Sequence, residues 1–525
     1  MRWLVVFFAL FPVAARAQRW IGPAERLIEE WRITEAVRAA APLLRDHAGD
    51  GEVIYLDGDL LFLQGDYAGA ARRLREAIAH APPGAPEGEW RGLADLAAAT
   101  AEATRGFAEA RSPGGHFIIR YAPGKDALLL PYAFEALEAA YKEVGVRDFG
   151  DAPVEPVRVE IYPEVADLAK VSTLTQKEIE TSGTIALCKF NRLMIVSPRA
   201  LVRGYPWLDT LAHEYTHFVV SRASYNSVPI WLHEGLAKFE ERRWRDPDDE
   251  GLTPTMEHLL ATALAHNKRL ITFAEMYPSM AKLPSQADTA LAFAEVFTVV
   301  EYLHERKGWE GVRAVIERMK AGESDAGAIA SVLGETFDEF QRDWKAWLKA
   351  KRLKMRPGLV PASLKFVTIG SEKKSSKKEE DDSQDITEER ARKFARLGGM
   401  LRAHGRLGPA AVEYEKAQAL VGAGHPAIAD KLARTYLALN DPDQAIATAE
   451  PALALYPDLA GPSVILGEAY LKKGLRDQAA PLFDAAIRIS PFDPTPHCGL
   501  AKIYAAKSDA RAPREQNACA ELSGE

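Results

Sequence analysis

The pattern of apolar and polar positions divides the chain into regions with different periodicities. In residues 18–111 and again in 391–525, apolar and small residues recur at helical spacing, in units of about 34 residues. Residues 112–355 begin with short runs of β-branched and aromatic residues and continue with helical patterns. The runs that predict strands are 116–121, 157–162, 184–188 and 193–197. The pattern predicts a multidomain protein, with an α+β domain between two all-α arrays.

Small and aromatic residues occupy matching positions in the helical units. One front unit has Gly58, Gly65, Tyr67, Ala70, Leu74, Ala77 and Pro82, and one rear unit has Gly467, Tyr470, Gly474, Ala479, Phe483, Ala486 and Pro491. Small residues let two helices pack closely, and a single unit cannot bury its own apolar face, so the units must stack. The spacing resembles tetratricopeptide repeats. This resemblance implies a concave surface that binds peptides or protein partners; a purely structural stack is the alternative.

A candidate metal site begins at His213-Glu214-Tyr215-Thr216-His217, an H-E-x-x-H motif. On a helix, positions i and i+4 share one face, so His213 and His217 can direct two imidazoles at one ion. Glu214 lies about 100° further round the helix, where it can reach a metal-bound water without being a ligand. This arrangement is the one that a zinc peptidase needs.

Glu234 is the best candidate for the third ligand. Sixteen residues separate it from His217, in the segment Trp231-Leu-His-Glu-Gly235. Pro229 is well placed to begin a second helix, with residues 222–228 as the loop before it. Two antiparallel helices joined in this way can bring Glu234 back to the histidines. Two imidazoles and one carboxylate are a typical ligand set for catalytic zinc.

The segments TLAHEYTHFVV and PIWLHEGLAKFEE resemble the gluzincin zinc peptidases, and most closely the peptidase MA-like domain. The similarity extends over residues near 112 to 353. It implies a zincin-like fold with one Zn²⁺ per chain, held by His213, His217 and Glu234. It also implies that Glu214 is the general base for hydrolysis of peptide bonds by an activated water.

Two positions depart from the family pattern. Relatives often have Ala-Tyr in the helix after the site, where this chain has Ala292-Phe293, and phenylalanine cannot donate a hydrogen bond to an oxyanion. Tyr215, His233, Tyr302 and His304 are possible substitutes. A zinc-bound histidine usually donates its second ring N–H to a carboxylate or a carbonyl, and Lys238, one turn after Glu234, cannot accept it. Asp209, Glu240 and Glu241 are the alternative acceptors. For each of these three residues, a solvated charge on a helix surface is the simpler interpretation. A peptidase-fold scaffold with little or no activity, which binds partner proteins in the cell envelope, is therefore the alternative function.

Charge and composition limit the partners. The formal net charge is −8, which argues against nucleic acid as a partner, because phosphate contacts need a basic face. A peptide or protein substrate, and protein partners on the repeats, remain. Residues 356–390 contain a densely charged stretch without large apolar residues, which predicts a flexible linker.

The N-terminus has the features of a cleavable signal peptide, residues 1–17. Arg2 precedes an apolar run too short to span a bilayer, and Ala15-Arg16-Ala17 fits a cleavage site. We expect no transmembrane segment after cleavage and a periplasmic or secreted protein. Cys498 and Cys519 are close enough in sequence to pair in an oxidising compartment, whereas Cys188 lies in a strand-like run and is expected to be a buried thiol.

Overall fold

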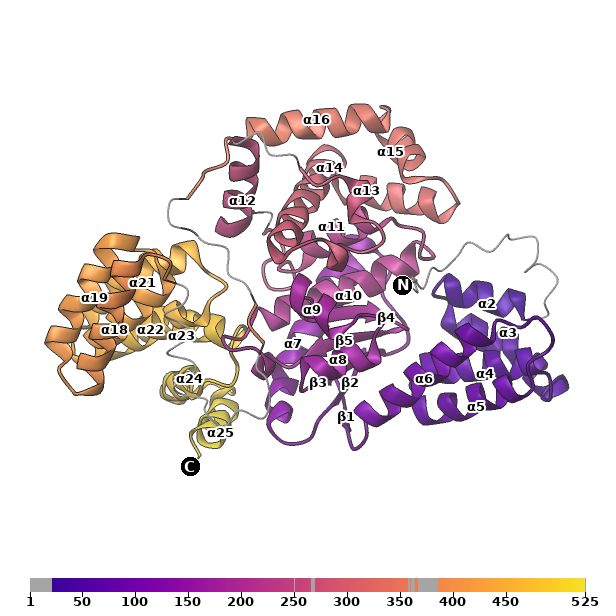
Figure 1. Cartoon of the computed structure of the whole chain (residues 1–525), viewed down its shortest axis with the longest axis horizontal. Helices are drawn as coiled ribbons and strands as arrows, with labels where there is room; N and C mark the ends of the chain where they lie inside the picture. Colours follow the sequence, from indigo (N-terminus) through magenta and orange to yellow (C-terminus); the bar gives the residue numbers. More distant parts are fainter. Residues whose placement is uncertain are drawn as a thin grey trace.

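The computed structural model describes residues 21–249, 251–265, 270–356, 359, 364–366 and 386–524. Figure 1 shows a central domain containing the sheet, with one helical array on each side of it. The predicted fold class is confirmed: a mixed α+β domain lies between two all-α arrays. The predicted signal peptide, residues 1–17, lies outside the described residues. Within the described part of the chain, no helix combines the length and apolar character that a bilayer span requires.

The N-terminal array consists of antiparallel helices that pack in pairs. Its helices are α2 (Gly22–Glu29), α3 (Ile33–Asp46), α4 (Gly51–Gln64), α5 (Tyr67–Ala79) and α6 (Glu87–Ala103). Asp50 and Asp66 cap α4 and α5, each accepting a backbone N–H of the first turn. A Cβ on Gly58 would lie 2.7 Å from Leu74 Cγ, so the small residue allows α4 to approach α5 closely.

A five-stranded mixed sheet forms one layer of the central domain. Its order is β1-β2-β3-β5-β4, with parallel pairing between β2, β3 and β5 and antiparallel pairing at both edges. The strands are β1 (Ala108–Arg111), β2 (Phe117–Tyr121), β3 (Val157–Tyr162), β4 (Ala186–Lys189) and β5 (Arg192–Val196). All four predicted strands are present, and β1 is additional. Phe190 and Asn191 both have positive φ, 56° and 57°, as a two-residue type I′ hairpin requires.

Helices cover the sheet and make up the rest of the central domain. They are η1 (Lys125–Leu129), α7 (Leu130–Ala140), η2 (Tyr141–Phe149), α8 (Val165–Val171), α9 (Gln176–Ser182), η3 (Pro198–Ala200), α10 (Trp207–Ala223), α11 (Ile230–Glu240), α12 (Pro254–Ala265), α13 (Phe273–Met276), η4 (Met280–Lys282), α14 (Gln286–Lys320), α15 (Asp325–Leu333) and α16 (Phe337–Ala350). The predicted capping box of Thr336 and Glu339 starts α16. Phe340 is fully buried and Phe337 packs beside it, as their spacing predicts.

The C-terminal array repeats the same helical pairing. Its helices are α18 (Glu389–Ala403), α19 (Leu407–Val421), α20 (Pro426–Ala438), α21 (Pro442–Leu455), α22 (Ala460–Lys472), α23 (Arg476–Ile487), α24 (Pro494–Ala506) and α25 (Ala512–Ser523). Gly398 lies against the ring of Tyr414, and Phe483 lies between Gly467 and Gly499. Each large residue therefore fills the space opposite a repeated glycine.

Most of the predicted linker, residues 356–390, lies outside the described residues. A described part of it contacts the central domain: Phe366 forms a β-bridge with Leu201, and Val202 donates its N–H to Lys365 O. Leu364–Phe366 is therefore ordered against the domain, which the sequence did not predict.

The C-terminal array is attached to the start of α10. Trp207 donates its indole N–H to Ile487 O at 3.1 Å and its backbone N–H to Arg488 O at 3.1 Å. Tyr205 donates its N–H to Ile489 O. Ile487 and the two residues after α23 thus supply acceptors for Tyr205 and for Trp207, the first residue of α10, whose backbone N–H has no partner within the helix. A second contact joins Tyr132 of α7 to Glu515 of α25, at 2.8 Å.

The N-terminal array is attached to the sheet by a buried polar network. Glu160 of β3 pairs with Arg192 of β5, both side chains fully buried, and accepts a hydrogen bond from Tyr67 of α5. Trp31, after α2, packs edge-on against Phe218 of α10, with ring centroids 5.5 Å apart. Both arrays therefore contact α10 directly.

The structure settles the pairing of Cys498 and Cys519, which the sequence left open, and corrects the predicted burial of Cys188. Cys498 and Cys519 form a disulfide that joins α24 to α25. Cys188 is a free thiol on β4, but it is half-buried rather than buried, because β4 is an edge strand. Burial by its neighbours raises the pKa of this thiol well above its ordinary value, so Cys188 is not a reactive thiolate.

Gly467→Ala is expected to lower the stability of the C-terminal array by about 1–3 kcal/mol. The new Cβ would lie 2.5 Å from Phe483 Cε1, and Phe483 cannot retreat because Gly499 is on its other side. Gly408→Ala, in the open at α19, is the matched control and is expected to be neutral or slightly stabilising. Urea unfolding followed by circular dichroism measures both. Equal midpoints would contradict the close packing.

Candidate metal centre

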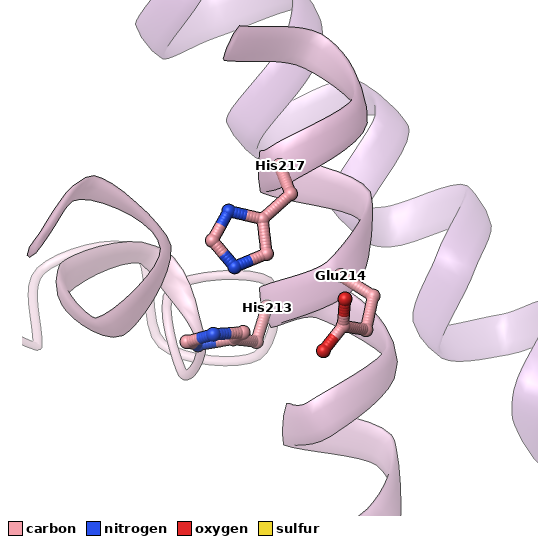
Figure 2. A group of neighbouring side chains, drawn as sticks. All are labelled: His213, Glu214 and His217. Atoms are coloured by element: carbon pink, nitrogen blue, oxygen red, sulfur yellow. The ribbon is translucent and has the colours of Figure 1, made fainter. Parts of the chain in front are cut away.

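Helix α10 presents the H-E-x-x-H residues toward the interior of the domain. His213 and His217 project from the same face of the helix, and Glu214 projects to one side of them (Figure 2). The two imidazoles lie edge to face, with centroids 4.8 Å apart. Their ligand atoms and that of Glu214 all lie within 4.8 Å of one another. Because α10 is packed against the sheet, α7 and α11, these side chains are held in place before anything binds.

Helix α11 brings Glu234 back to the histidines, as predicted. Glu234 Oε2 is 3.5 Å from His213 Nε2 and 3.3 Å from His217 Nε2. The helix begins one residue later than predicted, since Pro229 is its N-cap and not its first residue. Gly235 allows the close approach to α14, because a Cβ there would lie 2.8 Å from Val296 O. In this Glu-Gly pair, Glu234 supplies the candidate ligand and Gly235 allows α11 to pack closely on α14.

The three groups fit a tetrahedral metal ion. Bonds of about 2.0–2.1 Å at tetrahedral angles place ligand atoms roughly 3.4 Å apart, which matches the two distances from Glu234. Glu214 Oε2 is buried and has no hydrogen-bond partner among the described residues, so one carboxylate oxygen is left facing the site. Two nitrogens, one carboxylate oxygen and a spare carboxylate are a donor set suited to zinc with a bound water.

The charges around the site favour a cation. Burial raises the pKa of Glu234, but the charge of His217 and hydrogen bonds with both histidines outweigh it and leave this pKa well below its ordinary value. Burial lowers the pKa of His213, but Glu234 and Glu241 raise it to about 10. Burial raises the pKa of Glu214 above its ordinary value, which suits a group that takes up a proton.

His217 is oriented by a neighbour that the sequence did not identify for this role. Its Nδ1 lies 2.6 Å from His233 Nδ1, and His233 Nε2 lies 3.1 Å from Ser221 Oγ. If His217 Nε2 faces a metal, its Nδ1–H donates to His233, which must then be neutral and donate from Nε2 to Ser221. Burial, reinforced by His217, lowers the pKa of His233 to about 3, so that it is neutral at physiological pH.

His213 has a carboxylate on its outer side. Its Nδ1 is 3.6 Å from Glu241 Oε2, and Lys238 Nζ donates to Glu241 Oε1 at 2.6 Å. Lys238 therefore positions the carboxylate instead of contacting the histidine. The interpretation of Asp209, Glu240 and Glu241 as solvated charges is wrong. Asp209 is buried and binds Arg245 and Trp244, Glu240 is fully buried, and Glu241 is half-buried.

The four residues that could replace the missing tyrosine as an oxyanion donor all have other contacts. Phe293 faces the site, with its ring centroid 6.0 Å from that of His213. Tyr302 packs on Phe340 and Trp347, and His304 packs on Phe239 and Trp309. Tyr215 is a core aromatic against Phe117. His233, the fourth candidate, is bonded to His217.

Edge strand β4 lies beside the site. The backbone of Cys188 lies close enough to the Glu214 carboxylate to lower its pKa, against the larger effect of burial. Val196 donates to Ile185 O, and the antiparallel register continues from there, so the N–H and C=O groups of Ala186 and Cys188 point away from β5. β4 is therefore an edge strand beside the three candidate ligands, and the backbone of Cys188 on its outer side lies against Glu214.

An α+β domain with this histidine and carboxylate cluster, set between helical arrays, defines a peptidase-like protein with repeats. More specifically, a family model described as the Peptidase MA superfamily matches residues 139–350, and a tetratricopeptide repeat model matches residues 431–494. The chain thus contains a peptidase MA superfamily domain, of a superfamily that is typically metal-dependent, flanked by tetratricopeptide repeats. The repeats suggest interaction with proteins.

Chains of solved structures also match this chain. A chain of the APC/C hetero-tetramer Cut9–Hcn1 is 13% identical, with 98% of this chain and 81% of that chain covered and a TM-score of 0.26. Yeast Tom70 is 13% identical, with 96% and 84% covered and a TM-score of 0.24. Scores of this size carry no argument about the fold. No curated protein matches the chain.

Replacing His233 by phenylalanine is expected to weaken zinc binding about 10- to 100-fold, because His217 loses the acceptor that fixes its ring. Competition with a fluorescent zinc chelator measures the dissociation constant. Ser221→Ala removes only the outer bond and is expected to have a smaller effect. An unchanged zinc affinity in the His233 variant would show that His217 needs no such partner.

Proposed function

We propose that the protein is an exported zinc peptidase, in which His213, His217 and Glu234 hold one zinc ion per chain. The observation that carries the proposal is the position of Glu234 Oε2, 3.3 and 3.5 Å from two imidazole nitrogens that α10 presents on one face. When bound there, zinc supplies Lewis acidity that polarises a carbonyl and lowers the pKa of water toward 7.

The residues around the ion would perform the proton transfers and position the substrate. Glu214 accepts a proton from the attacking water and delivers it to the leaving amine; its raised pKa and its free Oε2 support this role. An extended peptide adds to the edge of β4 through the outward N–H and C=O of Ala186 and the outward C=O of Cys188.

Export is part of the proposal and rests on two observations. The N-terminal sequence has the features of a signal peptide, and the Cys498–Cys519 disulfide suits an oxidising compartment such as the periplasm. The repeats would recruit protein substrates or partners.

A scaffold that binds proteins without cutting them is the second candidate. The observation that favours it is Phe293, which faces His213 where a hydrogen-bond donor would assist catalysis. Both candidate functions use the same metal site, and only the rate of peptide hydrolysis distinguishes them.

The test measures metal and turnover on the full mature chain. The zinc content of the purified protein, measured by mass spectrometry, is expected to be about one ion per chain. Digestion of a peptide library is expected to give cleavage products, which disappear when a chelator removes the metal and return when zinc is added. Zinc without any cleavage would favour the scaffold. A protein that binds no zinc would contradict both the ligand assignment and the mechanism.

A further inference from the structure

A cavity of about 320 Å³ lies next to the candidate metal centre, between the central domain and the C-terminal repeats. Its size is at the lower end of small-ligand pockets, which run from about 300 to 1,000 Å³. Tyr205, Met256 and Phe293 line it from the central domain. Tyr456, Asp458 and Leu459 line it from the turn between α21 and α22 of the repeats.

Two of the lining residues connect the cavity to the metal centre. Phe293 packs edge-on against His213, the candidate ligand. Lys238 holds Glu241, whose carboxylate lies 3.6 Å from the outer nitrogen of the same histidine. A peptide placed along β4 with its scissile bond at Glu214 therefore has this cavity within reach of a neighbouring side chain.

The wall contributed by the repeats is fixed in position. Trp207 and Tyr205 bond the end of α23 to the start of α10, and Gly204 has φ +67° with a Cβ position only 2.1 Å from Ile489 O, so no larger residue fits this junction. Tyr456 is buried, and Asp458 of this wall and Lys238 of the central domain line the cavity with opposite charges.

We propose that this cavity receives a large apolar side chain next to the scissile bond, and that the α21–α22 turn of the repeats is one wall of the substrate site. The proposal rests on the proposed peptidase function and gives it a substrate class. Most lining side chains are apolar, among them Met256, Phe293 and Leu459, so burying an apolar group against them is favourable. The charged lining residues are Arg203, Lys238, Lys365 and Asp458, and the Glu peptide in the test below measures whether they attract an acidic side chain instead. The repeats thus contribute to substrate selection next to the scissile bond, in addition to any binding of substrate proteins elsewhere on the repeat surface.

Leu459 allows a clean test, because it is the N-cap residue of α22 and does not contact the ligands. Leu459→Asp puts a charge into the cavity while giving the helix a favoured cap, which offsets part of the cost of that charge. Urea unfolding of the variant checks that it is folded. Leu475→Asp is the matched control: Leu475 is the N-cap of α23, is exposed and does not line the cavity.

The experiment uses acetyl-Gly-Ala-Ala-Xaa-Ala-Gly-amide peptides with Xaa as Ala, Leu, Phe or Glu. The wild-type protein is expected to prefer Leu or Phe over Ala by about tenfold or more in kcat/KM. Leu459→Asp is expected to reduce this ratio about tenfold, and Leu475→Asp to leave it within about twofold. An apolar preference that Leu459→Asp leaves intact, or no apolar preference, overturns the proposal.

Binding separates this proposal from the catalytic one. If the wild-type protein cleaves none of the peptides, the proposed activity fails, and dissociation constants for the Glu214→Gln protein decide the cavity. Tighter binding of the Phe peptide than of the Ala peptide, lost on adding Leu459→Asp, supports the cavity. Equal affinities for the two peptides overturn it.

Discussion

Glu214→Gln is expected to lower kcat by about 10²–10⁴-fold while zinc stays bound at about one ion per chain. The carboxylate is buried, its pKa is raised by that burial, and its Oε2 has no partner among the described residues. Glutamine keeps the shape and the contact with Cys188's strand but cannot accept a proton. A loss confined to kcat, with unchanged KM, identifies a group that acts in the transition state.

His217→Ala is the matched comparison for this variant. It removes a candidate ligand and is expected to lose both zinc and turnover, whereas Glu214→Gln loses turnover alone. Hydrolysis measured on a cleavable peptide, together with zinc content, distinguishes the two. Full activity in Glu214→Gln would exclude Glu214 as the base.

Trp207→Ala is expected to lower stability by about 3–5 kcal/mol, as large-to-small changes of buried aromatic residues do. Trp207 is 1% exposed, begins α10 and donates its indole N–H to Ile487 O of the repeats. Its loss opens a cavity at the junction and leaves that carbonyl without its partner. Since α10 carries the candidate ligands, zinc affinity is expected to fall as well.

Two further variants separate packing from hydrogen bonding at this junction. Trp207→Phe keeps most of the ring volume and is expected to cost about 1–2 kcal/mol, chiefly through the lost hydrogen bond. Trp347→Ala, at a half-buried tryptophan of α16, is expected to cost less than Trp207→Ala. Urea unfolding monitored by far-ultraviolet circular dichroism gives the ranking. A Trp207→Ala protein as stable as wild type would mean that the repeats do not support α10.

The sequence was most informative where local chemistry decides the structure. The run at 157–162 is strand β3 over the same residues, because β-branched residues alternate there between turn signals. Strand β1 was not predicted, since Ala-Glu-Ala-Arg has no strand preference of its own and is extended only because it pairs with β2. The cysteine pairing and the Thr336 capping box depend on short spacings, and both are present.

The candidate site was predictable only in part, for a geometric reason. Helical spacing places His213 and His217 on one face, and the second helix brings Glu234 to them. The rotation of α11 relative to α10 decides which side chains contact the outer nitrogens of the two histidines. Residue spacing along the chain does not determine this rotation. His233 was therefore found in a role that the sequence did not assign, and Glu241 is the one of the three named alternatives that lies beside a candidate ligand. Lys238 supports the site one contact further out.

The contact between Trp207 and Ile487 also sets an order of events during synthesis. The two residues are 280 positions apart, and ribosomes add about 5–20 residues per second, so the start of α10 waits roughly 14–56 s for its acceptors. Until then the helix with the candidate ligands lacks the partners of its first turn. A nascent or truncated chain thus carries an unfinished site, and assembly of the centre is delayed until almost the whole polypeptide has been made.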